Sequence, residues 1–256
     1  MENGKARIVE LNRIHPLDDR LAEHFKYYYQ PQFYLNTKKL KGFECLLRLH
    51  HPTEGVFSPE SFLDSLNKGS LWDRLWPTML LKISKEQLKH GHKLKLAINV
   101  SPRELESGLD GVFLKTFCQM VKSGQLNADN IEIEITEDYR ISDFDKVNNS
   151  IATLRSLGSI VAIDDFGSGF CNLSAIDRLD IQGVKIDKGL ILGIESSEIK
   201  QTIVRSLVDI ANIKGCYVLA EGIETEFQRK LVTGLGCDYG QGFLLGHPSP
   251  SFIHAI

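Results

Sequence analysis

An alternation of short strand-like and longer helix-like segments constrains the fold of this chain more than any other feature. Apolar alternation and β-branched residues mark eight segments, at residues 26–35, 43–50, 94–100, 131–136, 159–164, 183–187, 217–221 and 239–245. From the second segment onward they are separated by stretches with helical period, such as residues 59–88, 104–122, 141–157 and 198–214. This order predicts a parallel sheet of the α/β class, and eight strands predict closure into a TIM-like (β/α)8 barrel.

The first connection breaks this pattern. Only residues 36–42 join the first two segments, whereas a parallel crossover needs about a dozen residues or more. We therefore expect the first strand to run antiparallel to the others. No low-complexity linker divides the chain. The sequence predicts one barrel domain over residues 26–256, preceded by an N-terminal extension of residues 1–25.

Composition excludes several classes of protein. The net charge is −3 and no long Lys/Arg tract is present, which argues against a long nucleic acid as partner. No window approaches the roughly 18 apolar residues of a membrane span, so we expect a cytoplasmic protein without membrane attachment. The five cysteines never form a CxxC pair, which argues against a disulfide framework or a zinc site.

Polar residues, which are uncommon in a packed apolar core, lie at the ends of most of the predicted strands. Barrel enzymes place their chemistry at these strand ends. Each residue alone has an ordinary explanation, such as a helix cap, a solvated strand face or a turn. In a closed barrel, however, alternate residues of every strand point inside and would converge on one mouth. The set comprises Glu44, Arg48, Asn99, Ser101, Glu132, Glu134, Thr136, Asp164, Asp165, Lys185, Asp187, Glu221 and Gln241.

Charge balance in such a mouth predicts bound metal. Two carboxylates about 4 Å apart repel by roughly 4 kcal/mol at an effective dielectric of 20, and Lys185 and Arg48 are too few to compensate the acids. Oxygen ligands without Cys or His favour Mg²⁺ or Mn²⁺. Adjacent Asp164 and Asp165 suit two ions, because one carboxylate can bridge both. Two residues fit this pattern less well. Glu44 lies early in its strand, whereas the other acids lie near strand ends. Glu137 has the opposite strand parity to Glu134, so it would lie in the site only if the strand ends before it.

The same residues form motifs that resemble those of the EAL-domain phosphodiesterases, which hydrolyse cyclic di-GMP, over about residues 26–250. The matching motifs are Gln30-Pro31, Glu44-Cys45-Leu46-Leu47-Arg48, Asn99-Val100-Ser101, Glu134-Ile135-Thr136-Glu137, Asp164-Asp165-Phe166-Gly167-Ser168-Gly169, Val184-Lys185-Ile186-Asp187, Ala220-Glu221-Gly222-Ile223-Glu224 and Gln241-Gly242. Cys45 replaces the family's usual Ala, and Leu49, Ser168 and Phe170 stand where Trp, Thr and Tyr are common.

This resemblance implies roles for individual residues. It assigns the first metal ion to Glu44, Asn99, Glu134 and Asp164, and the second to Asp164, Asp165 and Glu221. Lys185 would contact the nucleophilic water and Gln241 would lie near that water or the second ion. Glu137 would hold the loop of residues 165–169. Arg48 would bind a substrate phosphate, and further substrate contacts are expected from Gln30, Leu46, Asp187 and Glu224.

The resemblance also implies an activity. It is hydrolysis of cyclic di-GMP to linear 5′-pGpG with two Mg²⁺ or Mn²⁺ ions, which lowers a bacterial second messenger that controls biofilm formation and motility. A homodimer and a regulatory protein partner would be in keeping with the family. The main alternative is a module that binds cyclic di-GMP without cleaving it. An aldolase-type barrel with Lys185 as Schiff-base nucleophile and a glycosidase with two acids are further alternatives.

Overall fold

The computed structural model describes residues 21–67, 71–91, 93–137, 139–167 and 173–252. The strands are β1 (Phe25–Tyr34), β2 (Leu40–His51), β3 (Gly55–Phe57), β4 (Leu96–Val100), β5 (Ile131–Ile135), β6 (Ile160–Phe166), β7 (Gly183–Ile186), β8 (Tyr217–Ala220) and β9 (Tyr239–Gly240). The helices are α1 (Leu21–His24), α2 (Leu63–Asn67), α3 (Leu71–Lys89), α4 (Pro102–Glu106), α5 (Val112–Lys122), α6 (Phe144–Ser156), α7 (Leu173–Arg178), α8 (Lys188–Ile191), α9 (Glu198–Lys214) and α10 (Glu226–Gly234).

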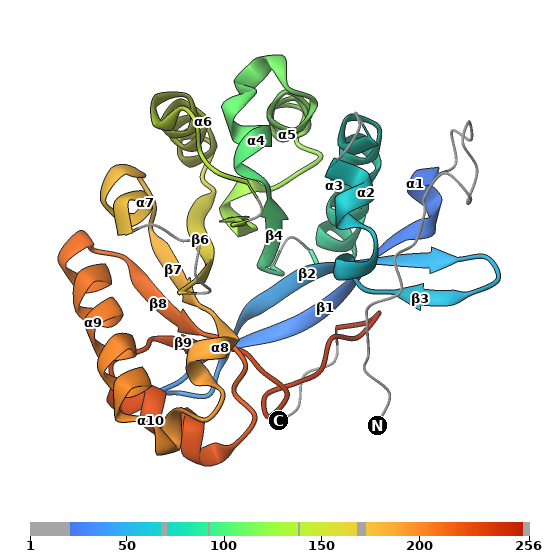
Figure 1. The fold of residues 1–256 in the computed structure, drawn as a ribbon. Coiled ribbons are helices and arrows are strands. Elements are labelled where there is room, and N and C mark those ends of the chain that lie inside the picture. Colours follow the sequence, from blue (N-terminus) through green and yellow to red (C-terminus); the bar gives the residue numbers. More distant parts are fainter. Residues whose placement is uncertain (1–20, 68–70, 92, 138, 168–172, 253–256) are drawn as a thin grey trace.

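The strands form one closed sheet. Their order is β1-β9-β8-β7-β6-β5-β4-β2-β3, and β2 also pairs with β1, which closes a barrel of eight strands. Strand β3 pairs only with the far end of β2 and lies outside this ring. The longer helices α3, α5, α6 and α9 lie around the outside of the sheet (Figure 1). The predicted (β/α)8 barrel is confirmed.

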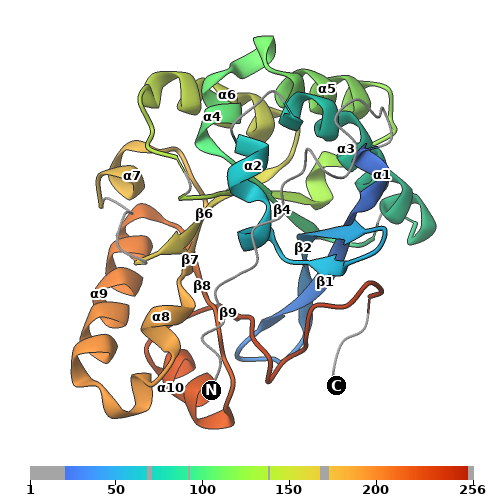
Figure 2. The same ribbon diagram turned by 45° about the vertical axis from the view of Figure 1, so that its right-hand side comes forward.

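Strand β1 runs antiparallel to both of its neighbours, β2 and β9, as the short first connection predicted. Its register places Gln30 opposite Glu44 and Gln32 opposite Gly42. Phe33 then lies opposite Leu40, so Lys41 is an extra residue in β2 and forms a β-bulge. The C-terminal segment returns to the barrel wall, where Ser249 pairs with Tyr29 of β1 (Figure 2).

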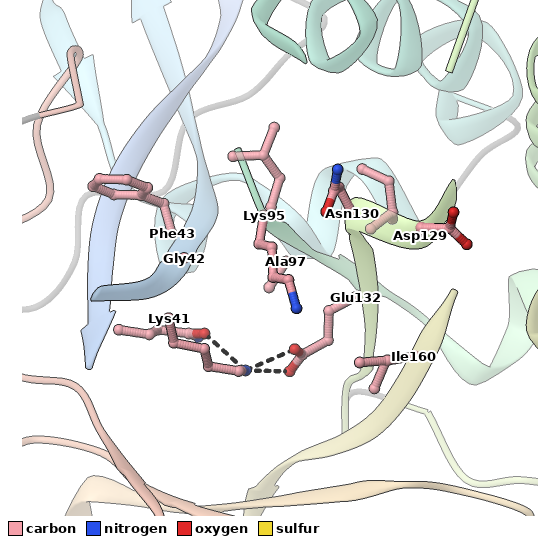
Figure 3. Close-up of a pocket in the computed structure, with 12 residues that line it drawn as sticks. Lys41, Gly42, Phe43, Lys95, Ala97, Asp129, Asn130, Glu132 and Ile160 are labelled. Carbon is pink, nitrogen blue, oxygen red and sulfur yellow. Dashed lines mark hydrogen bonds and ion pairs between the residues drawn. The ribbon is translucent and has the colours of Figure 1, made fainter. Parts of the chain in front are cut away.

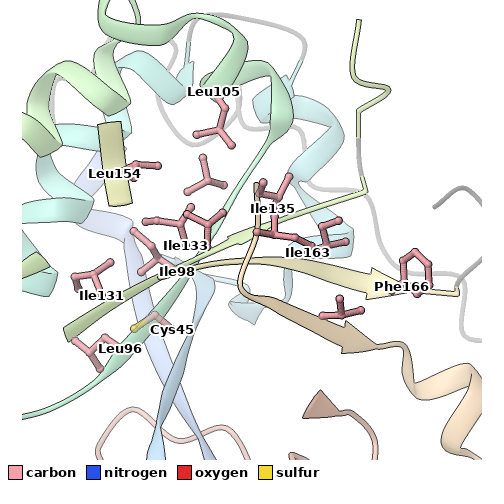
Figure 4. Close-up of a cluster of buried hydrophobic side chains, with 14 of the residues drawn as sticks. Cys45, Leu96, Ile98, Leu105, Ile131, Ile133, Ile135, Leu154, Ile163 and Phe166 are labelled. Carbon is pink, nitrogen blue, oxygen red and sulfur yellow. The ribbon is translucent and has the colours of Figure 1, made fainter. Parts of the chain in front are cut away.

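The main hydrophobic core lies between the sheet and the surrounding helices. Strand β5 shows how the sequence builds it, because its isoleucines alternate with glutamates and the two kinds of residue point to opposite faces. Ile133 is fully buried and lies near Leu105 of α4 and Leu154 of α6 (Figure 4). Cys45 belongs to the same apolar cluster. The outward isoleucines leave Glu132 and Glu134 on the face that points into the barrel.

Several predicted helices differ from the structure. Residues 59–88 form a 3-10 turn at Pro59–Ser61 followed by α2 and α3, and residues 68–70 between the two helices lie outside the described residues. Residues 104–122 divide into α4 and α5, because Gly108 takes a positive φ of 57°. Helical periodicity continued across both breaks and concealed them. None of the described helices is long and apolar enough to span a lipid bilayer.

Candidate active site

The polar strand ends converge on one cavity of about 720 Å³ at the mouth of the barrel. Twelve residues singled out from the sequence line it: Gln30, Glu44, Leu46, Asn99, Ser101, Thr136, Glu137, Asp164, Asp165, Glu221, Glu224 and Gln241. Glu134 and Lys185 are completely buried. Glu137 reaches the cavity because β5 ends at Ile135, two residues earlier, so strand parity no longer governs its side chain.

The ammonium group of Lys185 lies among four carboxylates. Its Nζ is 2.7 Å from Asp164 Oδ1, 2.7 Å from Glu221 Oε1, 2.9 Å from Glu134 Oε2 and 3.5 Å from Glu44 Oε2. Among the residues that the structure describes, Lys185 is the one cation within ion-pair distance of these four carboxylates. Four ionised carboxylates around one ammonium would leave three negative charges uncompensated in a buried site, which is unfavourable without further cations.

The pKa values of these groups reflect burial and crowding. Burial raises the pKa of Glu134, Asp164 and Glu221, with further increases from neighbouring carboxylates that Lys185 only partly offsets. Burial alone would also raise the pKa of Glu44, but Lys185 and hydrogen bonds from Gln241 and Asn99 lower it overall. Burial would lower the pKa of Lys185, yet the surrounding carboxylates raise it well above its ordinary value. A raised lysine pKa disfavours the Schiff-base alternative, which needs a neutral amine.

The carboxylates form two overlapping groups that could each hold a metal ion. Glu44, Glu134 and Asp164 offer oxygen atoms within 4.8 Å of one another, and so do Asp164, Asp165 and Glu221. Asp164 belongs to both groups. Asn99 fits the first group, because its Nδ2 donates to Glu44 Oε1 at 2.7 Å while its buried Oδ1 has no hydrogen-bond partner among the described residues. An all-oxygen set of this kind suits a hard divalent cation.

A backbone irregularity lets adjacent aspartates reach the same site. Neighbouring residues of a regular strand point to opposite faces. The β6–β7 register jumps from Ile163 opposite Val184 to Phe166 opposite Ile186, and Asp165 has a φ of +53° in the left-handed region. Aspartate tolerates this conformation better than most residues, and such strain commonly occurs at functional sites. The irregularity explains why Asp164 and Asp165 lie in one carboxylate group.

Comparison with known proteins identifies the family. A sequence profile of the EAL domain matches residues 17–248. This chain belongs to the EAL-domain family. The cyclic di-GMP phosphodiesterase PA2567 of Pseudomonas aeruginosa is 33% identical over 230 residues, covering 88% of this chain and 38% of that protein. The bifunctional diguanylate cyclase/cyclic di-GMP phosphodiesterase MucR of the same organism is 29% identical over 248 residues, which cover 94% of this chain and 36% of that protein. This chain thus covers well under half of the length of each of these two relatives.

Solved structures of EAL domains share this fold. The phosphodiesterase domain of MucR in complex with c-di-GMP superposes with a TM-score of 0.79 at 27% identity, covering 89% of this chain and 98% of that one. An EAL domain protein from Listeria monocytogenes superposes with a TM-score of 0.80 over 94% of this chain, and its 24% identity supports the fold alone. The family match begins before residue 26, where the sequence pattern placed the start of the barrel.

Two residues predicted to bind substrate in this EAL domain have other contacts. Arg48 donates from Nη1 to its neighbour's carbonyl, Leu47 O, at 2.8 Å, and its guanidinium lies 5.6 Å from the Tyr28 ring centroid. Asp187 caps α8, and its carboxylate accepts a hydrogen bond from Gly189 N at 2.8 Å. Neither lines the cavity in the described part of the chain, so their substrate roles remain predictions. Ser168 and Phe170 lie outside the described residues.

The structure adds three polar residues, Gln32, Lys41 and Tyr217, that the sequence did not single out. They form hydrogen bonds inside the barrel, below the carboxylates, together with Glu132, whose strand parity had placed it on the same face as Glu134. Gln32 shares strand parity with Gln30, so it could have been found by extending the inward face of that strand toward the barrel floor. The inward direction of Lys41 had no such signal, because it results from the bulge in β2.

The carboxylates make stability depend on pH. Burial and neighbouring Asp164 raise the pKa of Asp165 from 3.8 to about 7. A carboxyl group whose pKa is raised by folding contributes stability that is present below its unfolded pKa and is lost as pH rises through its folded pKa. We therefore expect the metal-free EAL domain to melt at a lower temperature at about pH 8 than at about pH 6. Thermal denaturation with a chelator would measure this, and a melting temperature that rises over the range would contradict it.

Proposed function

We propose that this EAL domain hydrolyses one phosphodiester bond of cyclic di-GMP and releases linear 5′-pGpG, with two Mg²⁺ or Mn²⁺ ions in its site. The observation that carries the proposal is the pair of carboxylate groups that share Asp164 at the barrel mouth. Relatives named as cyclic di-GMP phosphodiesterases support the substrate. Two adjacent divalent ions, when bound, would supply an activated water and neutralise charge on the phosphoryl oxygens.

The chain's own residues would position these components. Glu44, Asn99, Glu134 and Asp164 would hold one ion, and Asp164, Asp165 and Glu221 the other. Gln241 donates to Glu44 Oε2 at 2.6 Å and to Gln30 Oε1 at 3.0 Å, which fixes the direction of that carboxylate. In the metal-free site the surrounding carboxylates raise the pKa of Lys185 well above its ordinary value, and its ammonium would donate a hydrogen bond to the attacking water and stabilise negative charge.

The cavity supports a nucleotide ligand. Its volume of about 720 Å³ lies within the range of small-molecule sites. Trp72 and Trp76 line it with ring centroids 5.4 Å apart; because Trp76 is only 2% exposed, the half-buried Trp72 would be the ring that stacks on a purine base. Gln30, Leu46 and Glu224 also line the cavity and would contact the substrate. Arg48 would bind a phosphate, provided that its guanidinium turns from Leu47 O toward the mouth.

The purified protein, incubated with cyclic di-GMP and Mg²⁺ or Mn²⁺, is expected to produce linear 5′-pGpG, and a chelator should abolish the product. Chromatography of the nucleotides would measure both. Turnover should depend on added divalent ion, because Lys185 alone leaves most of the carboxylate charge in the site uncompensated. If the protein binds cyclic di-GMP but forms no product with any of several divalent ions, it is a non-hydrolysing binding module and this proposal is wrong.

We also propose a homodimer and regulation through a protein partner. Light scattering of the purified chain with and without cyclic di-GMP would test the dimer. A mass that stays at one chain under both conditions would contradict it.

A further inference from the structure

A buried chain of hydrogen bonds leads from the barrel floor to the carboxylates. Lys41 Nζ donates to Glu132 Oε2 at 2.6 Å and to Gln32 Oε1 at 3.1 Å (Figure 3). Gln32 Nε2 donates in turn to Gln241 Oε1 at 3.0 Å and to Glu134 Oε1 at 3.3 Å. Gln241 Nε2 then donates to Glu44 Oε2 at 2.6 Å. The chain thus ends on two carboxylates of the first proposed metal site, Glu44 of β2 and Glu134 of β5.

The direction of every bond in this chain follows from its first donor. An ammonium group can only donate, so Lys41 requires Gln32 to present its carbonyl oxygen. The amide nitrogen of Gln32 must then face Glu134 and Gln241. Because Gln241 accepts that bond with its oxygen, its own nitrogen faces Glu44. Reversal of one amide would place two acceptors or two donors against each other in a buried site, which is unfavourable because each group would lose its hydrogen-bond partner.

The surroundings hold Lys41 in place. Lys41 is the extra residue of the bulge in β2, and its side chain is only 8% exposed. Glu132 balances its charge, and the rings of Tyr217 and Tyr239 lie 4.9 and 5.0 Å from its Nζ. Tyr217 also donates its hydroxyl hydrogen to Glu132. Gln32 itself is 1% exposed.

We propose that Lys41 and Gln32 are positioning residues, which set the orientation of Gln241, Glu44 and Glu134 for metal binding from the opposite end of the barrel. This inference rests on the proposed function in one respect, the use of Glu44 and Glu134 as metal ligands. Groups that orient metal ligands by hydrogen bonds typically change metal affinity about 10- to 100-fold when they are removed.

The test compares Mn²⁺ affinity, measured by calorimetry, in two variants that keep the ligands. Gln32→Leu removes all three hydrogen bonds of the side-chain amide at nearly constant volume. The double variant Lys41→Met with Glu132→Gln removes the first donor without leaving an unpaired charge. Each is expected to weaken Mn²⁺ binding about 10- to 100-fold, with kcat falling more than KM rises. Gln87→Leu is the matched control, because it makes the same exchange at a buried glutamine that bonds to the backbone of Asn127 and not to the carboxylates, and its Mn²⁺ affinity should stay within about twofold of the parent.

Crystal structures of the metal-free variants provide a readout independent of turnover. In Gln32→Leu, we expect Gln241 to rotate so that its Nε2 leaves Glu44 Oε2. Parent-like positions of Gln241 and Glu44, together with unchanged Mn²⁺ affinity in both variants, would overturn the inference. If the parent binds Mn²⁺ without cleaving cyclic di-GMP, the proposed function fails while the affinities still decide this inference. If the parent binds no Mn²⁺, the orientation of Gln241 in the variant structures decides it.

Discussion

Glu44→Gln is expected to reduce hydrolysis of cyclic di-GMP by about 10³-fold, because a loss of about 4 kcal/mol of charge stabilisation at a metal site corresponds to that factor. The amide keeps the size of the side chain but removes the negative charge. It also places a donor against the nitrogen of Gln241 or of Asn99, both of which now donate to Glu44. Initial rates with Mg²⁺ and calorimetric Mn²⁺ affinity would measure the loss.

A matched exchange on the surface controls for that result. Glu198→Gln makes the same chemical change in the first turn of α9, where the side chain is exposed. Its rate should stay within about twofold of the parent, since surface substitutions usually change stability by no more than about 0.5 kcal/mol. Equal rates for Glu44→Gln and the parent would contradict the assignment of Glu44 to the metal site.

Lys185→Met is expected to destabilise the metal-free protein by roughly 3–5 kcal/mol, the usual cost of breaking a buried ion pair by removing one partner. For a domain of this size, each kcal/mol lowers the melting temperature by about 2–4 °C. The loss should be larger at about pH 8 than at pH 6, because protonation relieves the repulsion among Glu134, Asp164 and Glu221. Thermal denaturation with a chelator would measure it, and turnover should be lost.

Added Mn²⁺ should restore much of that stability, because divalent charge replaces the missing ammonium and binding to the folded state alone contributes about 2.7 kcal/mol at 100 times the dissociation constant. Lys115→Met, at an exposed position of α5, should melt close to the parent under all conditions. A Lys185→Met variant that melts at the parent temperature in chelator would show that the ammonium does not compensate the carboxylates.

Local signals explain which helices the sequence predicts well. Residues 198–214 were predicted as a helix and form α9 with those bounds. Ser197 caps its first turn by accepting from Lys200 N, and Gly215 ends it in the left-handed conformation, so both ends are encoded within a few residues. Residues 59–88 also carry such marks at their internal break, where Asn67, Gly69 and Ser70 are residue types that commonly end or begin helices. The prediction followed the apolar periodicity instead and joined two helices into one.

Long-range contacts explain what the sequence could not predict in the site. The parity of Glu134 and the antiparallel direction of β1 follow from short stretches of chain. Two bulges do not: one turns Asp165 toward the carboxylates, and the other gives Lys41 its place beneath them. A bulge exists only relative to the partner strand, because register is a property of a pair.

The sequence alone determined the barrel, its reversed first strand and the identity of the acidic residues at the mouth, because these depend on the order of local patterns along the chain. The tertiary structure alone decided how their charges are arranged. It placed Lys185 among four carboxylates and linked Glu44 through Gln241 and Gln32 to Lys41 at the floor. These contacts join residues far apart in the chain, and their directions follow from which buried group can donate and which can only accept.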